Sequence, residues 1–252
     1  MLTIDHRLLG IQAGDQVLDV GCGEGRHSWG MYNQIDCLIY ALDIEEENLK
    51  KTRYTFYLMD EQEKRSGKWL AIRGDATNLP FKDASFDRVV CSEVLEHLDD
   101  DRRGIRELVR VLKASGMLAV SVPTYLTETI YWKISKDYHS RPGCHVRKYR
   151  AGELVNLLRQ NNLRVYAIRH RHALHSVYWL LRCLFGIKNE KALIPSLYHK
   201  FLVWDLKTKS KPIRLLDDVL NHVFPKSIVI YAQKGENGRY SPSNQRASEL
   251  HQ

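Results

Sequence analysis

The feature that most constrains this chain is a short apolar strand that runs directly into three closely spaced glycines. Residues 17–28 read VLDVGCGEGRHS, with glycines at positions 21, 23 and 25. Glycine adopts the backbone conformations that a tight strand-to-helix turn requires, and it leaves bare main chain that a ligand can approach. We therefore expect an α/β sheet whose first turn binds a ligand.

The residues around these glycines favour a cationic ligand over a pyrophosphate. A dinucleotide-binding turn has its third glycine at the position of Arg26, and the Lys-Ser/Thr pair of a phosphate loop does not follow here. Asp19 and Glu24 flank the turn instead. Because carboxylates repel a pyrophosphate and attract an ammonium or sulfonium ion, the turn predicts a cationic nucleoside as its ligand.

Apolar runs alternate with helical patterns along most of the chain, which predicts a doubly wound α/β fold with a seven-stranded, Rossmann-like sheet. A basic, helical insertion is expected before the last strand. The expected strands are residues 16–20, 37–42, 69–73, 86–91, 117–122, 163–168 and 227–233, and the expected helices are residues 25–32, 45–64, 99–113 and 151–161.

The length of 252 residues suits one large domain with insertions. We interpret residues 1–169 and 226–234 as the ligand-binding domain. The segments 123–150 and 170–225 are expected on the substrate side, the first as an irregular insertion and the second as a helical lid. Residues 235–252 lack apolar periodicity and are expected to be disordered.

Charge is distributed unevenly along the chain. Residues 1–120 contain 16 Lys and Arg against 21 Asp and Glu, whereas residues 121–252 contain 22 against 9. The second half is therefore expected to meet an anionic partner, namely a phosphorylated substrate, a lipid surface or nucleic acid. An ordinary solvated basic surface is the alternative.

Residues 173–187 (ALHSVYWLLRCLFGI) are nearly all apolar and have basic residues on both sides, but they are too few to span a bilayer. This segment either packs as a lid or lies on an anionic membrane. The membrane interpretation assigns the contact to Trp179, Leu180, Leu184 and Phe185.

The cysteine pattern and the N-terminal residues bear on location. Five cysteines form no CxxC pair, and the first ten residues show no secretion signal. We therefore expect a reducing, cytoplasmic location, with peripheral membrane contact if residues 173–187 bind lipid.

Five motifs in order resemble those of the class I S-adenosylmethionine-dependent methyltransferases, and they cover roughly residues 10–122. The turn before the fifth strand has Ala-Ser-Gly where the family usually has Pro-Gly-Gly. The motifs are the glycine turn, Asp43 at the end of the second strand, GDATNLPF (74–81), FDRVVCSEVLEHL (86–98) and RVLKASGMLAVSVP (110–123).

The resemblance implies S-adenosylmethionine as the cofactor, with Asp43 accepting both ribose hydroxyls and Asp75 and the Ala76 backbone beside the adenine. Simpler roles remain open: Asp19 as a helix cap, Asp43 as a turn residue and Asp75 in an Asx turn. The implied cofactor contacts are Asp19, Gly21, Cys22, Gly23, Glu24, Gly25, Asp43, Ile44, Asp75, Ala76, Ser92 and Glu93.

Glu93, Glu96 and His97 share one face if their segment is helical, and such a set ligates a divalent ion or forms an acid–base group. The motif, with His145 in GCHVRKY, resembles that of ubiquinone-pathway O-methyltransferases and small-RNA 2′-O-methyltransferases, some of which hold a metal there. The resemblance thus implies an ion such as Mg²⁺ and catalytic roles for Glu93, His97 and His145. Alternatively, Glu93 lies near the cofactor and His97 only caps the segment.

The predicted function is S-adenosylmethionine-dependent methyl transfer to a small-molecule or lipid-like acceptor, at oxygen. The mixed aromatic and cationic side chains of residues 123–150 suit a ring-bearing or anionic acceptor. One alternative is an RNA methyltransferase whose basic second half holds nucleic acid. The other is a protein that binds S-adenosylmethionine without catalysis.

Overall fold

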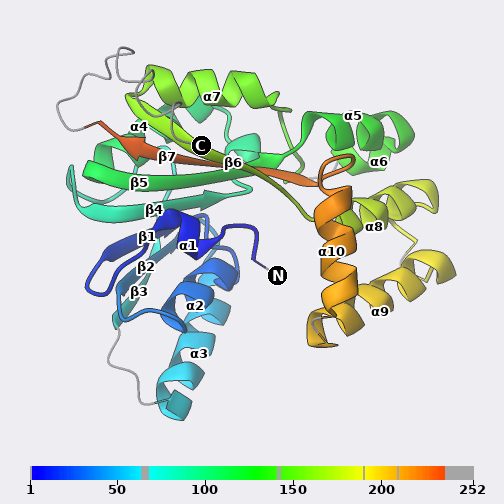
Figure 1. Cartoon of the computed structure of the whole chain (residues 1–252), viewed down its shortest axis with the longest axis horizontal. Coiled ribbons are helices and arrows are strands. Elements are labelled where there is room, and N and C mark those ends of the chain that lie inside the picture. Colours follow the sequence, from blue (N-terminus) through cyan, green and yellow to red (C-terminus); the bar gives the residue numbers. More distant parts are fainter. Residues whose placement is uncertain (1, 64–67, 141–142, 190, 209, 236–252) are drawn as a thin grey trace.

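A computed structural model describes residues 2–63, 68–140, 143–189, 191–208 and 210–235. Its centre is a seven-stranded sheet with the strand order β3-β2-β1-β4-β5-β7-β6 (Figure 1). The strands are β1 (Gln16–Val20), β2 (Leu38–Asp43), β3 (Lys68–Arg73), β4 (Phe86–Ser92), β5 (Leu112–Pro123), β6 (Leu163–Arg171) and β7 (Ser227–Lys234).

Strand pairing sets the position of the crevice at which an open α/β sheet is expected to bind a ligand. β1 pairs in parallel with both β2 and β4, and β7 runs antiparallel to both β5 and β6. The chain order therefore reverses between β1 and β4, and ligands of open α/β sheets bind at the carboxyl ends of the strands at such a point. The glycine turn follows β1, so the sheet places it at this crevice.

Helices cover both faces of the sheet, which confirms the predicted doubly wound fold. On one face lie α1 (His6–Leu9), α2 (Arg26–Tyr32) and α3 (Glu46–Glu63), and on the other lie α4 (Asp101–Val111) and α7 (Ala151–Gln160) (Figure 1). Each face has its own apolar core. Leu18, Val89, Leu108 and Leu154 represent the first core, and Val17, Met31, Ile39 and Phe56 represent the second.

Five further helices stand at the end of the sheet where β5 and β6 finish (Figure 1). They are α5 (Tyr125–Ile134), α6 (Lys136–His139), α8 (Ala173–Leu184), α9 (Leu193–Thr208) and α10 (Lys211–Leu220). The helical prediction for residues 170–225 is confirmed. The tail predicted from residue 235 onward lies outside the described residues, except for Gly235.

The prediction that residues 123–150 are irregular is wrong, because this segment begins with α5 and α6. The buried side chains of Tyr131 and Tyr138 pack with Cys183 and Ile187 in a third apolar cluster. Packing against α8, which lies 50 residues later, stabilises two helices that lack an apolar stripe visible in the sequence.

The four residues expected to contact a membrane lie in two different environments. Trp179 and Leu180 pack against the cluster around Tyr131, whereas Leu184 and Phe185 are exposed. Among the residues described, no helix has both the length and the apolar character needed to cross a bilayer. The inner side of α8 packs against α5 and α6.

The N-terminus of α8 is capped by side chains of α10, which fixes the two helices together. The Asn221 side-chain oxygen accepts a hydrogen bond from the Ala173 backbone N–H at 2.9 Å. The Asp217 carboxylate accepts one from the Leu174 N–H, also at 2.9 Å. These contacts satisfy two of the N–H groups that a helix start leaves without partners.

We expect Asn221→Ala to lower the free energy of unfolding by about 1–3 kcal/mol, because the buried Ala173 N–H loses its acceptor. Denaturant titration measures the loss, and amide exchange at Ala173 shows whether the opening is local. The exposed Asn189 provides the control substitution Asn189→Ala. Equal losses in both variants would show that the cap contributes nothing.

Candidate functional site

The three glycines of the turn after β1 serve different purposes. All have positive φ angles, +66° at Gly21, +55° at Gly23 and +87° at Gly25. An added Cβ would lie 2.3 Å from Val94 Cγ2 at Gly21 and 2.4 Å from Trp29 Nε1 at Gly25, so the chain's own packing requires these two glycines. An added Cβ at Gly23 would meet nothing within 4 Å. The bare main chain at Gly23 therefore faces open space that a ligand can occupy.

Asp43 joins this turn to the end of β2. Its Oδ2 accepts a hydrogen bond from the Gly23 N–H at 2.7 Å. Its Oδ1 accepts from the Glu45 N–H at 2.9 Å and from Asn48 Nδ2 at 3.3 Å. A carboxylate offers about four acceptor positions, so these three bonds leave room for about one ligand hydroxyl. Asp43 therefore holds the turn itself, as the simpler interpretation proposed, and still borders the ligand space.

The two acids that flank the turn lie in different environments. Asp19 is 1% exposed and accepts a hydrogen bond from Ser28 Oγ at 2.6 Å. Burial raises the pKa of the Asp19 carboxyl to about 6, although the Ser28 hydrogen bonds oppose this shift. Glu24 is exposed and forms an ion pair with Lys51. Only Asp19 thus keeps a buried charge that a cationic ligand would stabilise.

The remaining predicted cofactor contacts lie around this turn and along the neighbouring strand ends. The Cys22 N–H donates to the Leu42 carbonyl at 2.9 Å, which ties the turn to β2. Ile44 is 57% exposed beside Asp43 and presents apolar surface that suits a base ring. Asp75 Oδ1 accepts from the Thr77 N–H at 2.7 Å, so Asp75 forms the Asx turn given as its simpler role. Ala76 packs partly against the core.

The expectation that Glu93, Glu96 and His97 share one helical face is wrong. Glu93 has a φ of +58° and precedes a single turn of 3₁₀ helix, Leu95–His97, so the chain changes direction between Glu93 and Glu96. The Glu93 carboxylate instead accepts hydrogen bonds from Ser121 Oγ at 3.1 Å and from Lys226 Nζ at 3.3 Å. The neighbouring Ser92 Oγ lies 2.9 Å from Ser121 Oγ.

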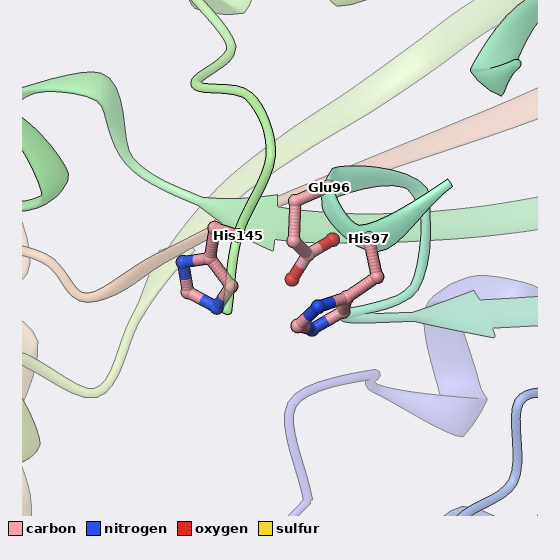
Figure 2. Close-up of side chains that lie close together, drawn as sticks. All are labelled: Glu96, His97 and His145. Atoms are coloured by element: carbon pink, nitrogen blue, oxygen red, sulfur yellow. The ribbon is translucent and has the colours of Figure 1, made fainter. Parts of the chain in front are cut away.

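Glu96, His97 and His145 do come together, and their side chains point toward one another (Figure 2). One ligand atom from each lies within 4.8 Å of the others. Glu96 is buried, and neither of its carboxylate oxygens has a hydrogen-bond partner among the described residues. A buried carboxylate without a partner is costly, so this cluster has the chemistry of a site that receives a cation.

Hydrogen bonds fix both imidazoles of the cluster through Nδ1. His145 Nδ1 lies 2.7 Å from the Glu128 carboxylate, and His97 Nδ1 lies 3.3 Å from the Cys144 carbonyl oxygen. Since both partners are acceptors, each Nδ1 carries the proton in the neutral ring and leaves Nε2 with its lone pair. Metal-binding histidines are usually oriented in this way by a carboxylate or a carbonyl.

Burial and neighbouring charges shift the pKa values around this cluster. Burial, with repulsion from Glu93, raises the pKa of Glu96 well above its usual range. Burial and the nearby His145 lower the pKa of His97. Burial alone would raise the pKa of Glu128, but the hydrogen bond from His145 lowers this pKa below its usual value. Glu128 therefore stays ionised, and His97 stays neutral at pH 7.

The sequence analysis missed several residues of the site. Glu128 lies in α5, is buried, and also accepts hydrogen bonds from Tyr138 at 2.8 Å and Trp132 at 3.1 Å. A lone acid within the aromatic run TYLTETIYW was the available signal. A cavity of about 330 Å³ opens beside the glycine turn. Its lining is Thr3, Arg26, Glu93, His172, His175, Trp179, Leu206, Lys226 and Ser227.

The fold and the site together define a Rossmann-like domain. Its glycine turn after β1 and its acid at the end of β2, Asp43, resemble those of class I methyltransferases. Comparison with known proteins agrees: residues 18–120 match the family model described as a methyltransferase domain. The solved structure of an S-adenosylmethionine-dependent methyltransferase from Methanosarcina mazei superposes with a TM-score of 0.62 at 20% identity. The superposition covers 93% of this chain and 98% of the solved chain, so the two proteins share a fold.

Two curated relatives align with the same region. The 27-O-demethylrifamycin SV methyltransferase of Amycolatopsis mediterranei is 34% identical over 113 residues, 45% of this chain and 40% of that protein. A Mycobacterium tuberculosis protein named a probable S-adenosylmethionine-dependent methyltransferase is 33% identical over 145 residues, 56% of this chain and 46% of its own. The match thus spans less than half the length of each relative. Residues 18–120 of this chain therefore match a methyltransferase domain, and the chain shares the fold of the solved methyltransferase.

We expect the affinity for S-adenosylmethionine to fall about tenfold between pH 7.5 and pH 5. Asp19, with a pKa of about 6 in the free protein, must lose its proton before its carboxylate can hold the cofactor's ammonium group. Calorimetry at both pH values measures this change and the accompanying proton release. In Asp19→Asn the affinity should no longer depend on pH in this range, and unchanged pH dependence in that variant would contradict this role.

Proposed function

We propose that this chain transfers a methyl group from S-adenosylmethionine to a hydroxyl group of a small, lipid-like molecule, with a divalent ion held by Glu96, His97 and His145. The methyltransferase domain over residues 18–120 supports the reaction class. The observation that carries the finer proposal is the buried, unpartnered carboxylate of Glu96 between two oriented imidazoles.

The residues around the glycine turn fit the cofactor. Open space at Gly23 accommodates it, Asp43 has acceptor capacity for a ribose hydroxyl, and the buried Asp19 carboxylate suits an ammonium group. S-adenosylmethionine supplies an electrophilic methyl group on a sulfonium centre, so the protein forms no covalent bond. Holding both reactants in attacking geometry supplies roughly 7–11 kcal/mol of the barrier reduction.

The Glu96 cluster fits a divalent transition metal better than the Mg²⁺ expected from the sequence. Two imidazole nitrogens and one carboxylate suit divalent transition ions such as Fe²⁺ or Zn²⁺, for which Mn²⁺ serves as a spectroscopic probe, whereas Mg²⁺ prefers oxygen ligands. Such an ion would lower the pKa of an acceptor hydroxyl. Glu128 holds the ring of His145, and the Cys144 carbonyl holds the ring of His97, so both Nε2 atoms stay oriented.

The cavity beside the glycine turn supports a small acceptor. Its volume of about 330 Å³ lies within the usual range for small-molecule sites. Its lining includes Arg26 and the ion pair of Lys226 with Glu93, and Trp179 and Leu206 supply apolar surface. The name of the relative 27-O-demethylrifamycin SV methyltransferase supports a small-molecule acceptor and methylation at oxygen.

We expect the wild-type protein to bind Mn²⁺ and Glu96→Gln to bind it at least tenfold more weakly, because the variant lacks the anionic ligand. Glu128→Gln should weaken binding about 10- to 100-fold through the loss of the second-shell hydrogen bond. Electron paramagnetic resonance of free Mn²⁺ measures both losses. His139→Ala is the control. His139 lies in α6, shortly before His145 in the chain, and stacks on Trp132 outside the cluster of metal ligands.

Binding of S-adenosylmethionine should be unchanged in Glu96→Gln, which separates the metal site from the cofactor site. Wild-type protein that binds no Mn²⁺, or a Glu96→Gln variant that binds it equally well, would refute the metal site. Methyltransferase activity that persists in excess chelator would show that any bound ion is not needed for the reaction.

We expect labelled methyl groups from S-adenosylmethionine to enter a lipid-containing small-molecule fraction of a cell extract when the wild-type protein is added. His145→Ala, which lacks one proposed ligand, should lower this incorporation, whereas His139→Ala should not. Label recovered in the RNA fraction would instead identify an RNA methyltransferase. Cofactor binding without any labelled product would support the non-catalytic alternative.

A further inference from the structure

The large, exposed apolar side chains of this protein are concentrated on α9 and α10. Of the 21 such residues in the described part of the chain, ten lie between residues 193 and 223. They are Leu193, Ile194, Leu197, Val203, Trp204, Leu206, Leu215, Leu216, Val219 and Val223. Exposed apolar side chains gathered in this way on two neighbouring helices indicate an interaction site.

The apolar face of α10 points away from the protein. Its inner side is polar, since Asp217 and Asn221 cap α8. Leu215 and Val219 are four residues apart, so they share the opposite side, where they are 67% and 57% exposed. Val223, in the turn after α10, is 69% exposed. A surface helix of a soluble domain normally has the reverse arrangement, with its apolar side turned inward.

α9 presents a similar outer side. Pro195 and Leu202 are its buried residues. Leu193, Leu197 and Trp204 are spaced by four and seven residues and are all more than half exposed. An exposed indole on such a helix suits the boundary between a bilayer and water.

Positive charge accompanies this apolar surface. Among the described residues between 188 and 223, six are basic and three are acidic. The basic residues are all exposed: Lys188, Lys191, Lys200, Lys207, Lys211 and Arg214. Apolar side chains that insert below the headgroups, with cations that attract anionic lipids, are the two requirements for peripheral membrane binding.

The charge argues against a second copy of this chain as the occupant. A two-fold interface would bring the same patch of each copy together, so the net positive charge of one patch would face that of the other. Like charges brought together at an interface are repulsive. An anionic membrane surface satisfies both the apolar and the cationic side chains.

The cavities behind this surface are consistent with such a location. A cavity of about 430 Å³ lies between α8, α9 and α10, with Leu174, Leu202 and Leu206 in its lining. It shares His175 and Leu206 with the cavity of about 330 Å³ that reaches Glu93 and Arg26 beside the glycine turn. The cavity between α8, α9 and α10 is therefore next to the proposed acceptor cavity.

We propose that the outer sides of α9 and α10 form a docking surface for membranes that contain anionic phospholipids. This proposal does not depend on the methyltransferase activity, because it concerns the attachment of the protein and not its reaction. The proposed surface consists of other residues than those expected from the sequence, because Trp179 and Leu180 pack against the apolar cluster around Tyr131.

The test is co-sedimentation of the full chain with phosphatidylcholine vesicles, with and without 30% phosphatidylglycerol. At 50 mM NaCl we expect most of the protein in the pellet with the anionic vesicles and in the supernatant with the neutral ones. Leu215→Ser/Val219→Ser should lower the partition coefficient at least tenfold. Both positions are exposed, so the substitutions remove no core contact.

Matched control variants distinguish binding by this surface from nonspecific apolar binding and from an effect of net charge. Tyr54→Ser/Leu70→Ser removes apolar residues of similar exposure, 64% and 47%, at the opposite end of the protein on α3 and β3, and should bind like wild type. Lys207→Gln/Lys211→Gln/Arg214→Gln should bind at least fivefold more weakly. Lys50→Gln/Lys68→Gln/Lys82→Gln, with the same change in net charge, should not.

Wild-type protein that stays in the supernatant with anionic vesicles at low salt would overturn the proposal. Equal losses of vesicle binding in each variant and in its matched control would also overturn it. Sedimentation equilibrium gives the mass in solution. A dimer that Leu215→Ser/Val219→Ser converts to a monomer would show that a second copy covers this surface, and would also overturn the proposal.

Discussion

The hydrogen bond from the Gly23 N–H to the Asp43 carboxylate, 2.7 Å long, is the interaction on which the ligand site depends. It joins the turn after β1 to the end of β2, and the parallel pairing of these strands brings the two groups to the same edge of the sheet. The main chain of the turn is thereby held open at Gly23. The same carboxylate borders the space where a ribose would lie, so one side chain serves both the fold and the binding of ligand.

The second part of the site is assembled by the helices that stand beyond the sheet. Glu96 and His97 lie in the 3₁₀ turn that follows β4, whereas His145 lies in the segment after α6 and Glu128 lies in α5. Burial deprives the Glu96 carboxylate of water, and no described residue compensates it by a hydrogen bond. This cost is borne where two imidazoles are oriented by hydrogen bonds through Nδ1, which is the arrangement expected for a cation site.

Much of the fold follows from local patterns. The strand Gln16–Val20 was predicted to the residue, and the other strands were predicted within three residues at each end, except that β5 begins at Leu112 and not at residue 117. Buried parallel strands such as β1 and β4 are continuous apolar runs and are therefore easily predicted. The errors lie where distant contacts decide. The helices α5 and α6 form because Tyr131 and Tyr138 pack on α8. Glu93 leaves the expected helical face because its backbone turns at a φ of +58°, and its carboxylate pairs with Lys226, 133 residues away.

The sequence by itself determined the sheet, the glycine turn and the identity of the acids at its edge, since these depend on residue spacing and on the conformations open to glycine. Only the tertiary structure decided which of those acids are free to bind a ligand. Glu24 and Asp75 are engaged by neighbours, whereas Glu96 is buried and has no hydrogen-bond partner among the described residues. The physical reason is that a carboxylate's availability depends on the donors and the burial around it, and these come from elements far away in the chain.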